Sequence, residues 1–269
     1  MMIRITVSGA AGRMGKAIMA SIENNPATEL AGALEREESP FIGKDTGDLS
    51  GLGKNGIRIT DSVEKALKNC DAVIDFSAPE ASLKLIETAV ASGKAIVVGT
   101  TGFSHHQRDE IKEIAQKGRV VMAPNMSIGV NILLKLVHEA ARAIGNEYDM
   151  EIIEAHHRLK KDAPSGTAIK IAEVAAAAVN RELEKVAVYE RKGIIGERRP
   201  EEIGIQTIRA GDIVGDHTII FAGPGERIEL THKASSRDTF AAGSVKAAVW
   251  LIDKPNGLYD MQDVLGLKS

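Results

Sequence analysis

Two hydrophobic periodicities alternate along the first half of the chain. Short apolar runs rich in β-branched residues, such as 71–76 and 95–98, predict buried strands. Segments such as 79–92, in which apolar residues recur at helical spacing, predict helices. Because the strands are apolar throughout instead of alternating, both faces of their sheet are expected to be covered. The pattern therefore predicts a doubly wound parallel α/β sheet in this half.

The expected elements of this half follow one another closely. Gly32 lies inside an expected strand and indicates close backbone packing there. Residues 35–56 are rich in glycine and charge and are interpreted as a surface loop, and Ser62 is a candidate helix N-cap. Strands are predicted at 3–7, 29–34, 57–60, 71–76, 95–98 and 120–123, and helices at 16–24, 63–69, 79–92 and 105–116.

The pattern changes after Gly129. Helices are predicted at 130–144, 167–180 and 240–252, and strands at 151–155, 203–209, 217–221 and 227–232. The last two strands flank the sequence AGPG at 222–225, which predicts a hairpin. Strands in succession are typical of an antiparallel or mixed sheet. We therefore expect a second, α+β domain built on a mixed sheet.

Composition limits the classes of protein to which the chain can belong. Hydrophobic residues make up 43%, and 34 basic against 37 acidic residues leave a net charge of −3. This balance, with only 3% aromatic residues, argues against nucleic-acid and membrane partners. A single cysteine, Cys70, excludes an intramolecular disulfide framework and an all-cysteine metal site. No apolar run reaches the ~18 residues of a membrane span, and the first residues do not resemble a signal peptide, so a cytoplasmic location is expected.

A glycine-rich turn joins the first expected strand to the first helix. Gly9, Gly12 and Gly15 follow the spacing G-x-x-G-x-x-G, one residue different from the common dinucleotide pattern. Glycines at such a turn let a pyrophosphate approach the free N–H groups of the helix N-terminus. The turn therefore predicts a Rossmann-type dinucleotide-binding domain, although a plain turn would have the same composition.

The end of the second expected strand supports the dinucleotide interpretation. Glu35 lies twenty positions after Gly15, close to the spacing of the acid that binds the adenosine ribose. Arg36 beside it suits a 2′-phosphate, so NADH and NADPH are both expected to be accepted. A solvated charge run is the alternative, since Glu37 and Glu38 follow. Arg13 is a candidate phosphate partner that would also suit the surface.

Two further loops lie at the carboxyl ends of expected strands in the same sheet. They span residues 99–102 and 123–127. Ligands of open α/β sheets bind at these ends, so both loops are expected to line the nicotinamide. Read as turns alone, they would need no ligand.

Residues 154–168, with the sequence EAHHRLKKDAPSGTA, carry the densest candidate chemistry. Ser165 and Thr167 are candidate N-caps for the next helix, and Gly166 leaves its backbone N–H groups accessible. Hydroxyls and free amides near several cations suit a carboxylate ligand. A histidine and a lysine within one short loop can also supply acid–base groups. Metal binding is disfavoured because adjacent histidines point apart on a strand, and a basic surface loop is the alternative.

Together, several segments resemble the bacterial dihydrodipicolinate reductases, also called 4-hydroxy-tetrahydrodipicolinate reductases, of lysine and diaminopimelate biosynthesis. The resemblance covers nearly the whole chain in order. It implies a dinucleotide-binding domain at 1–127 plus 237–269. A substrate-binding domain at 128–236 would also build a homotetramer through its sheet. The segments are GAAGRMG, LER, VGTTG, APNMS, EAHHRLKKDAPSGTA, TIRAGDIVGDHT and THKASSRDTFA.

The resemblance also implies roles for individual residues. His156 matches the family's proton donor and acceptor and Lys160 its proton donor, while Lys161 is auxiliary charge. The substrate would contact His157 and, at the start of the next helix, Ser165, Gly166 and Thr167. Ala11 stands where some members carry glycine. The cofactor would lie on Gly9, Ala10, Ala11, Gly12, Arg13, Met14, Glu35, Arg36, Gly99, Thr100, Thr101, Ala123, Pro124, Asn125 and Met126.

The expected reaction is hydride transfer from NADH or NADPH to a cyclic dicarboxylate imine, with loss of the 4-hydroxyl as water. Closure of the two domains, hinged near 127–129 and 236–237, is expected to bring the ligands together. The alternatives are an NAD(P)H-binding sensor without chemistry and a reductase of another cyclic imino acid. A semialdehyde dehydrogenase that uses Cys70 is disfavoured, because this cysteine precedes a strand away from the expected nicotinamide.

Overall fold

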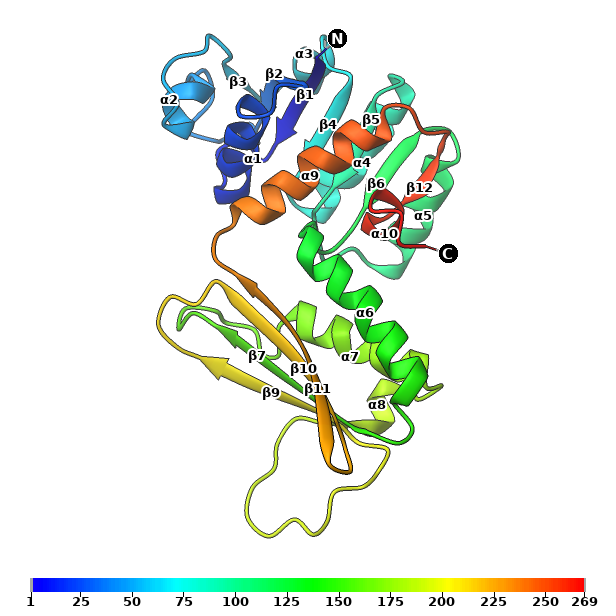
Figure 1. The fold of residues 1–269 in the computed structure, drawn as a ribbon. Helices are drawn as coiled ribbons and strands as arrows, with labels where there is room; N and C mark the ends of the chain where they lie inside the picture. The colour runs from blue at the N-terminus through cyan, green and yellow to red at the C-terminus, as the bar shows by residue number, and fades with distance from the viewer. Residues whose placement is uncertain (1, 269) are drawn as a thin grey trace. The chain divides into compact units, whose positions relative to one another are not determined.

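The computed structural model describes residues 2–268 and divides the chain into two compact units (Figure 1). The first contains the residues up to Ile128 together with those from Arg237 onward, and the second is Gly129–Ser236. No helix within residues 2–268 is long and apolar enough to cross a membrane.

The first unit is built on one parallel sheet. Its strand order is β12-β6-β5-β4-β1-β2-β3, so the order reverses beside β1, where β4 pairs on the side opposite β2. This reversal places the carboxyl ends of β1 and β4 next to each other. The strands are β1 (Ile3–Ser8), β2 (Thr28–Leu34), β3 (Ile59–Thr60), β4 (Ala72–Asp75), β5 (Ala95–Val98), β6 (Arg119–Met122) and β12 (Gly257–Tyr259).

Helices cover both faces of this sheet. In β5, Val97 packs in a cluster with α1 and α9, whereas its neighbours Ile96 and Val98 pack with α4 and α5. Successive side chains point to opposite faces of a strand, so a strand covered on both sides is apolar at every position. The helices of this unit are α1 (Arg13–Glu23), α2 (Thr46–Ser50), α3 (Val63–Leu67), α4 (Pro79–Ala91), α5 (His105–Ala115), α9 (Asp238–Leu251) and α10 (Met261–Val264).

The second unit contains a mixed sheet with strand order β11-β10-β7-β9-β8. β7 pairs parallel with β9 and antiparallel with β10, which forms a hairpin with β11. One face carries the core, in which Ile152, Ile205 and Phe221 contact α6, α7 and α8. The strands are β7 (Asp149–His156), β8 (Ala187–Val188), β9 (Ile203–Arg209), β10 (Gly215–Gly223) and β11 (Glu226–Ala234), and the helices are α6 (Ile128–Ile144), α7 (Gly166–Ala178) and α8 (Leu183–Val186).

The structure confirms the predicted fold class and adds short elements that the periodicity did not indicate. The stretch interpreted as a surface loop holds α2, whose N-cap Asp45 accepts hydrogen bonds from the backbone N–H groups of Gly47 and Asp48. The tail after α9 holds α10 and also β12, which pairs with β6. These pieces, together with α8 and β8, are two to five residues long, too short to show a period.

Candidate functional site

The glycine-rich turn forms a cradle that side chains would fill. Gly9 has a φ of +73°, and an added Cβ would lie 2.3 Å from the carbonyl oxygen of Phe76. At Gly15 an added Cβ would lie 2.2 Å from the carbonyl oxygen of Gly9. Gly12 is the N-cap of α1 and has no side chain that could cover the helix N-terminus. This arrangement fits the pyrophosphate of a dinucleotide.

The structure brings Glu35 to this turn. Its Oε1 accepts a hydrogen bond of 2.9 Å from the backbone N–H of Ala11. Its Oε2 accepts one of 3.3 Å from the N–H of Arg36, whose side chain is exposed. An acidic residue and a basic residue therefore adjoin the glycine cradle. Arg13, the first residue of α1, is also exposed.

The two loops expected at the nicotinamide follow β5 and β6. Thr100 is buried, and its Oγ1 donates to Asp75 and accepts from the backbone N–H of Ser77. An added Cβ at Gly99 would lie 2.2 Å from the ring of Phe76, which therefore packs against this loop. The remaining positions divide by exposure: Ala123 and Met126 are buried, Asn125 is half-buried, and Thr101 and Pro124 are exposed.

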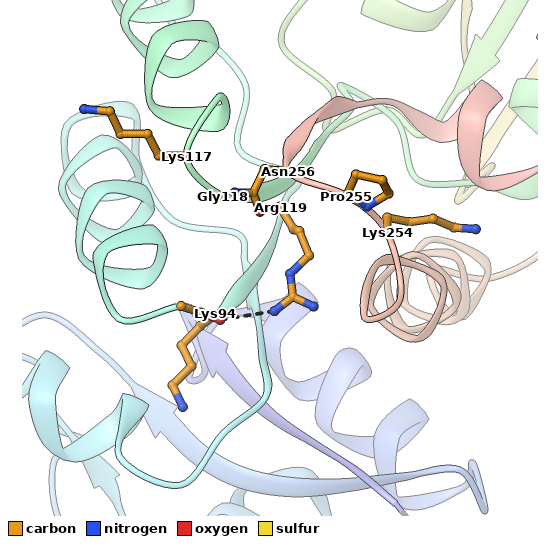
Figure 2. Close-up of a pocket in the computed structure, with 8 residues that line it drawn as sticks. Lys94, Lys117, Gly118, Arg119, Lys254, Pro255 and Asn256 are labelled. Atoms are coloured by element: carbon orange, nitrogen blue, oxygen red, sulfur yellow. Dashed lines mark hydrogen bonds between the residues drawn. The ribbon is translucent and has the colours of Figure 1, made fainter.

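A basic cavity in the same unit lies at the opposite edge of the sheet, at the amino ends of β5, β6 and β12 (Figure 2). It has a volume of about 410 Å³, and the Arg119 guanidinium donates to the carbonyl oxygens of Gly93 and Ile252. The ammonium groups of Lys94, Lys117 and Lys254 point away from one another (Figure 2). They do not converge on a common ligand, and the expected cofactor residues lie at the other edge.

Cys70 does not have the surroundings of a nucleophile. It is completely buried in an apolar cluster, and its thiol donates to the carbonyl oxygen of Leu67. Burial raises the pKa of the Cys70 thiol, so the thiolate is disfavoured. This removes the structural basis for a thioester mechanism.

In the second unit, a buried carboxylate organises the histidine-rich segment. Glu154 on β7 has no exposed surface. It pairs with both terminal nitrogens of Arg209, at 2.9 and 2.8 Å. It also accepts hydrogen bonds from the backbone N–H of Ser165 at 3.0 Å and from Oγ1 of Thr207 at 3.2 Å. Burial alone would raise the pKa of Glu154, but these donors and His156 outweigh it and lower that pKa.

His156 lies directly against this carboxylate. Its Nδ1 is 2.6 Å from Oε2 of Glu154, and its ring meets that of His217 edge to face with centroids 5.2 Å apart. Burial lowers the pKa of His156 more strongly than Glu154 raises it, and Lys160 and Arg209 add to the lowering. His156 is therefore neutral at neutral pH.

His217 links the histidine pair to the start of α7. Its Nε2 lies 2.9 Å from Oγ of Ser165, the N-cap of α7, which accepts from the backbone N–H of Ala168. Burial, reinforced by His156, lowers the pKa of His217 to about 4. Ser165 is thus the N-cap that the sequence offered, and Thr167 lies within the helix.

The other expected substrate residues adjoin this cluster. Lys160 forms an ion pair of 2.9 Å with the exposed Asp162. Nδ1 of His157 is buried and has no hydrogen-bond partner within residues 2–268. Gly166, the first residue of α7, is exposed, and nothing lies within 4 Å of an added Cβ. The helix N-terminus is therefore open for an anionic ligand.

Sequence reasoning did not identify Glu154, Thr207, Arg209 and His217 as members of this cluster. Strand register brings them together: β7 pairs His156 with Arg209 on one side and Glu154 with His217 on the other. The signals in the sequence were two segments: EAHHRLKKDAPSGTA begins with Glu154, and TIRAGDIVGDHT contains the other three. No group of three or more histidine, cysteine or acidic side chains within residues 2–268 could hold a metal ion.

Comparison with known proteins identifies the family. The model of the dihydrodipicolinate reductase N-terminus matches residues 3–126, and that of the C-terminus matches residues 129–265. The chain belongs to the dihydrodipicolinate reductase family. Full-length relatives agree. The 4-hydroxy-tetrahydrodipicolinate reductase of Hahella chejuensis is 54% identical, and that of Citrifermentans bemidjiense is 51% identical; each match covers 99% of this chain and 100% of the relative.

Solved structures support the fold of this reductase family member. A dipicolinate-bound dihydrodipicolinate reductase from Paenisporosarcina sp. TG-14 has a TM-score of 0.77 at 23% identity, covering 98% of this chain and 99% of that one. An amine dehydrogenase from Mycobacterium smegmatis has a TM-score of 0.60 at 14% identity, covering 95% of this chain and 94% of that one. The family predicted from the sequence motifs and its oxidoreductase class are therefore confirmed.

Proposed function

We propose that this chain reduces 4-hydroxy-tetrahydrodipicolinate to tetrahydrodipicolinate with NADH or NADPH, in the diaminopimelate pathway of lysine biosynthesis. The observation that carries the proposal is the cluster in the second unit, where His156, Lys160 and the open N-terminus of α7 adjoin one another. Acid–base groups beside an anion-binding helix terminus suit a substrate that bears carboxylates and must gain a proton. The relatives are named 4-hydroxy-tetrahydrodipicolinate reductase, and the solved dihydrodipicolinate reductase has dipicolinate, a cyclic dicarboxylate, bound.

The two units take different parts in this proposal. The first holds the dinucleotide, with the pyrophosphate on the backbone from Gly9 to Met14 and the nicotinamide against the loops after β5 and β6. The second holds the substrate, whose carboxylate is bound by Gly166 and Thr167 at the start of α7 and contacted by His157. Hydride transfer needs both ligands together, so we propose hinges at residues 127–129 and 236–237. A smaller radius of gyration with both ligands bound supports closure, and an unchanged scattering profile contradicts it.

Bound reduced nicotinamide supplies the hydride, and the chain's own residues handle the protons. The imine gains one hydride and one proton, and the 4-hydroxyl leaves as water, so NAD(P)⁺, tetrahydrodipicolinate and water are the products. Lys160 is the proposed proton donor, and His156 exchanges a proton beside it. Such groups contribute about 10²–10⁴-fold to a rate.

Both NADH and NADPH are proposed as cofactors, on the strength of two adjacent residues. Glu35, hydrogen-bonded to the N–H of Ala11, would accept from the ribose hydroxyls of NADH. The exposed Arg36 suits the 2′-phosphate of NADPH.

We also propose that the chain forms a homotetramer through the sheet of the second unit. Helices α6 to α8 pack on one face of that sheet. The other face carries Ile153, Ile220 and Ile208, the last 46% exposed. Isoleucines on a sheet face that no helix of this unit covers are suited to burial against another copy. Light scattering after size exclusion should give four times the mass of the chain, and Ile208→Arg should reduce it.

A steady-state assay tests the proposed activity. 4-Hydroxy-tetrahydrodipicolinate is generated in place from pyruvate and aspartate semialdehyde, and the loss of NADH or NADPH absorbance is followed. Turnover with both cofactors supports the proposal. Turnover only with another cyclic imino acid would change the substrate, and binding of NADH without turnover would indicate a sensor.

A further inference from the structure

We infer that Glu154 and Arg209 are positioning residues that hold His156 with its proton on Nδ1, so that Nε2 is the ring atom that meets the substrate. This inference rests on the proposed role of His156 in the reaction. Neither residue touches the reacting atoms in this account. Each acts through the histidine and the segments around it.

The hydrogen bonds around Glu154 determine which histidine nitrogen carries the proton. A carboxylate without a proton can only accept hydrogen bonds. Glu154 stays ionised at neutral pH, because Arg209 and the other donors lower its pKa despite burial. With 2.6 Å between Nδ1 of His156 and Oε2 of Glu154, Nδ1 must therefore be the donor. A neutral imidazole carries one proton, so Nε2 is left with a free lone pair.

Arg209 fixes the carboxylate and connects it to the segment that carries Lys160. Its two terminal nitrogens bind both oxygens of Glu154, a planar geometry that Arg provides and Lys does not. One of these nitrogens, Nη2, also donates a hydrogen bond of 2.7 Å to the backbone carbonyl oxygen of Asp162. The side chain of Asp162 in turn pairs with Lys160. Glu154 also binds the backbone N–H of Ser165, the N-cap of α7. The pair of the buried Glu154 and the half-buried Arg209 thus connects His156, the Lys160 segment and the N-terminus of α7.

The surroundings of Nε2 of His156 support its role as the ring atom that meets the substrate. An added Cβ at Gly215 on β10 would lie 3.0 Å from Nε2 of His156. The glycine therefore leaves space beside this nitrogen that any other residue would narrow. The edge-to-face contact with His217 fixes the plane of the ring. Glu154, Arg209, Lys160 and His217 are the charged or titratable groups that face His156.

A second ion pair on the same strand provides a matched control. Glu151 on β7 pairs with Arg191 at 2.8 Å and with Arg198 at 3.0 Å. Two arginines therefore bind this carboxylate, as Arg209 binds Glu154. The Glu151 carboxylate accepts hydrogen bonds from these arginines, whereas the Glu154 carboxylate also contacts a histidine. Glu151 is half-buried, whereas Glu154 has no exposed surface. A purely structural role for arginine-paired carboxylates on β7 would make both variants behave alike, whereas a positioning role separates Glu154 from Glu151.

Nitrogen-15 spectra of histidine-labelled protein test the tautomer directly, with His156→Asn used to assign the signals. Wild type and Glu151→Gln should show His156 with its proton on Nδ1 at neutral pH and above. Glu154→Gln offers both a carbonyl oxygen and an amide group, so His156 should become a mixture of tautomers. A proton on Nε2 in wild type, or an unchanged spectrum in Glu154→Gln, would overturn the inference. This readout needs no turnover, so failure of the proposed function would not affect it.

Steady-state kinetics with 4-hydroxy-tetrahydrodipicolinate and NADH or NADPH provide the second readout. Glu154→Gln should lower kcat by at least tenfold, within the ~10²–10⁴-fold that an acid–base group contributes, and leave the KM for cofactor unchanged. Arg209→Lys, which keeps the charge but loses the bidentate geometry, should fall between wild type and Glu154→Gln. Glu151→Gln should keep kcat within twofold. Equal losses in Glu151→Gln and Glu154→Gln would contradict a positioning role.

Loss of the carboxylate leaves Arg209 half-buried without its partner, so Glu154→Gln could fail to fold. The double variant Glu154→Gln/Arg209→Met removes both charges and replaces the pair with groups of similar volume, which restores stability in other buried ion pairs. It should fold, lose the defined His156 tautomer and keep the low kcat. A double variant with wild-type kcat and an Nδ1 proton on His156 would refute the inference.

Discussion

The two units offer different kinds of groups to their proposed ligands. The first unit offers backbone: the cradle of Gly9, Gly12 and Gly15 is open because side chains are absent, so the proposed ligand would meet N–H groups at the start of α1. The second unit offers side chains, held by the buried ion pair of Glu154 and Arg209. A backbone site is therefore sensitive to added atoms, whereas the histidine cluster is sensitive to removed charges.

The difference also separates binding from chemistry. Backbone N–H groups at a helix terminus attract an anion, but they do not ionise near neutral pH and so cannot act as general acids or bases. His156 and Lys160 can exchange protons, provided their surroundings fix which atom does so. Substitutions in the glycine cradle of the first unit should therefore change the KM for the cofactor, and those at His156 and Lys160 should change kcat.

Lys160→Ala should have the largest effect. Loss of the proposed proton donor should lower kcat by about 10²–10⁴-fold and leave the KM for NADH or NADPH unchanged. Steady-state kinetics check this, with the neighbouring exposed Lys161→Ala as a control that should remain close to wild type. Near-wild-type turnover of Lys160→Ala would remove this lysine from the mechanism.

Acid should destabilise the second unit through His217. Its pKa is about 4 in the folded chain against an ordinary value of 6.5, so the unfolded chain binds the proton more readily between these values. The contribution of neutral His217 to the free energy of unfolding is therefore complete above pH 6.5. It is lost as the pH falls toward 4, and the loss amounts to roughly 3 kcal/mol. Thermal unfolding at a series of pH values should show a shallower slope for His217→Gln than for wild type.

His138 on α6 provides the control for this pH dependence, because its side chain is 46% exposed. His138→Gln should keep the wild-type slope of unfolding temperature against pH. Equal slopes in wild type and His217→Gln would show that His217 does not account for the loss.

Paired glycine substitutions at the two helix termini should separate the ligands. Gly12→Val at the start of α1 should raise the KM for cofactor about tenfold, equivalent to ~1.4 kcal/mol of lost anion binding, and leave the KM for substrate unchanged. Gly166→Val at the start of α7 should do the reverse. Steady-state kinetics with each ligand varied in turn measure both effects, and a KM change in the other ligand would contradict the division of roles.

Arg36→Ala should have the smallest and most selective effect. Loss of one exposed guanidinium should raise the KM for NADPH severalfold, about 1 kcal/mol, and leave that for NADH unchanged. Glu37→Ala is the control for a general change in surface charge. Equal changes with both cofactors would show that Arg36 does not meet the 2′-phosphate.

The sequence was most informative where structure follows local pattern. The expected β5 at 95–98 and β9 at 203–209 have the observed bounds, and Ser62 and Ser165 are the N-caps of α3 and α7. Gly32 packs closely as expected, since an added Cβ would lie 2.8 Å from the carbonyl oxygen of Ala66. Hydrophobic periodicity and helix capping depend on residues that are close in the sequence, so strand bounds and N-caps can be predicted before the tertiary structure is known.

Features that depend on strand register could not be read in this way. Glu154 and Arg209 are 55 residues apart, and they meet because β9 pairs parallel with β7. Similarly, β12 is a strand only because β6 offers an edge for its three residues. The motif identified His156 and Lys160. The ion pair of Glu154 and Arg209 could be recognised only once the pairing of β7 with β9 was known.

Transfer of deuterium from the cofactor tests the central claim most directly. The wild-type protein is given 4-hydroxy-tetrahydrodipicolinate and either NADH or NADPH carrying deuterium at nicotinamide C4 on the transferred face. Mass spectrometry of the product should show tetrahydrodipicolinate with one deuteron for each cofactor oxidised. Cofactor oxidation without deuterium in the product, or no oxidation when both ligands are present, would contradict the account.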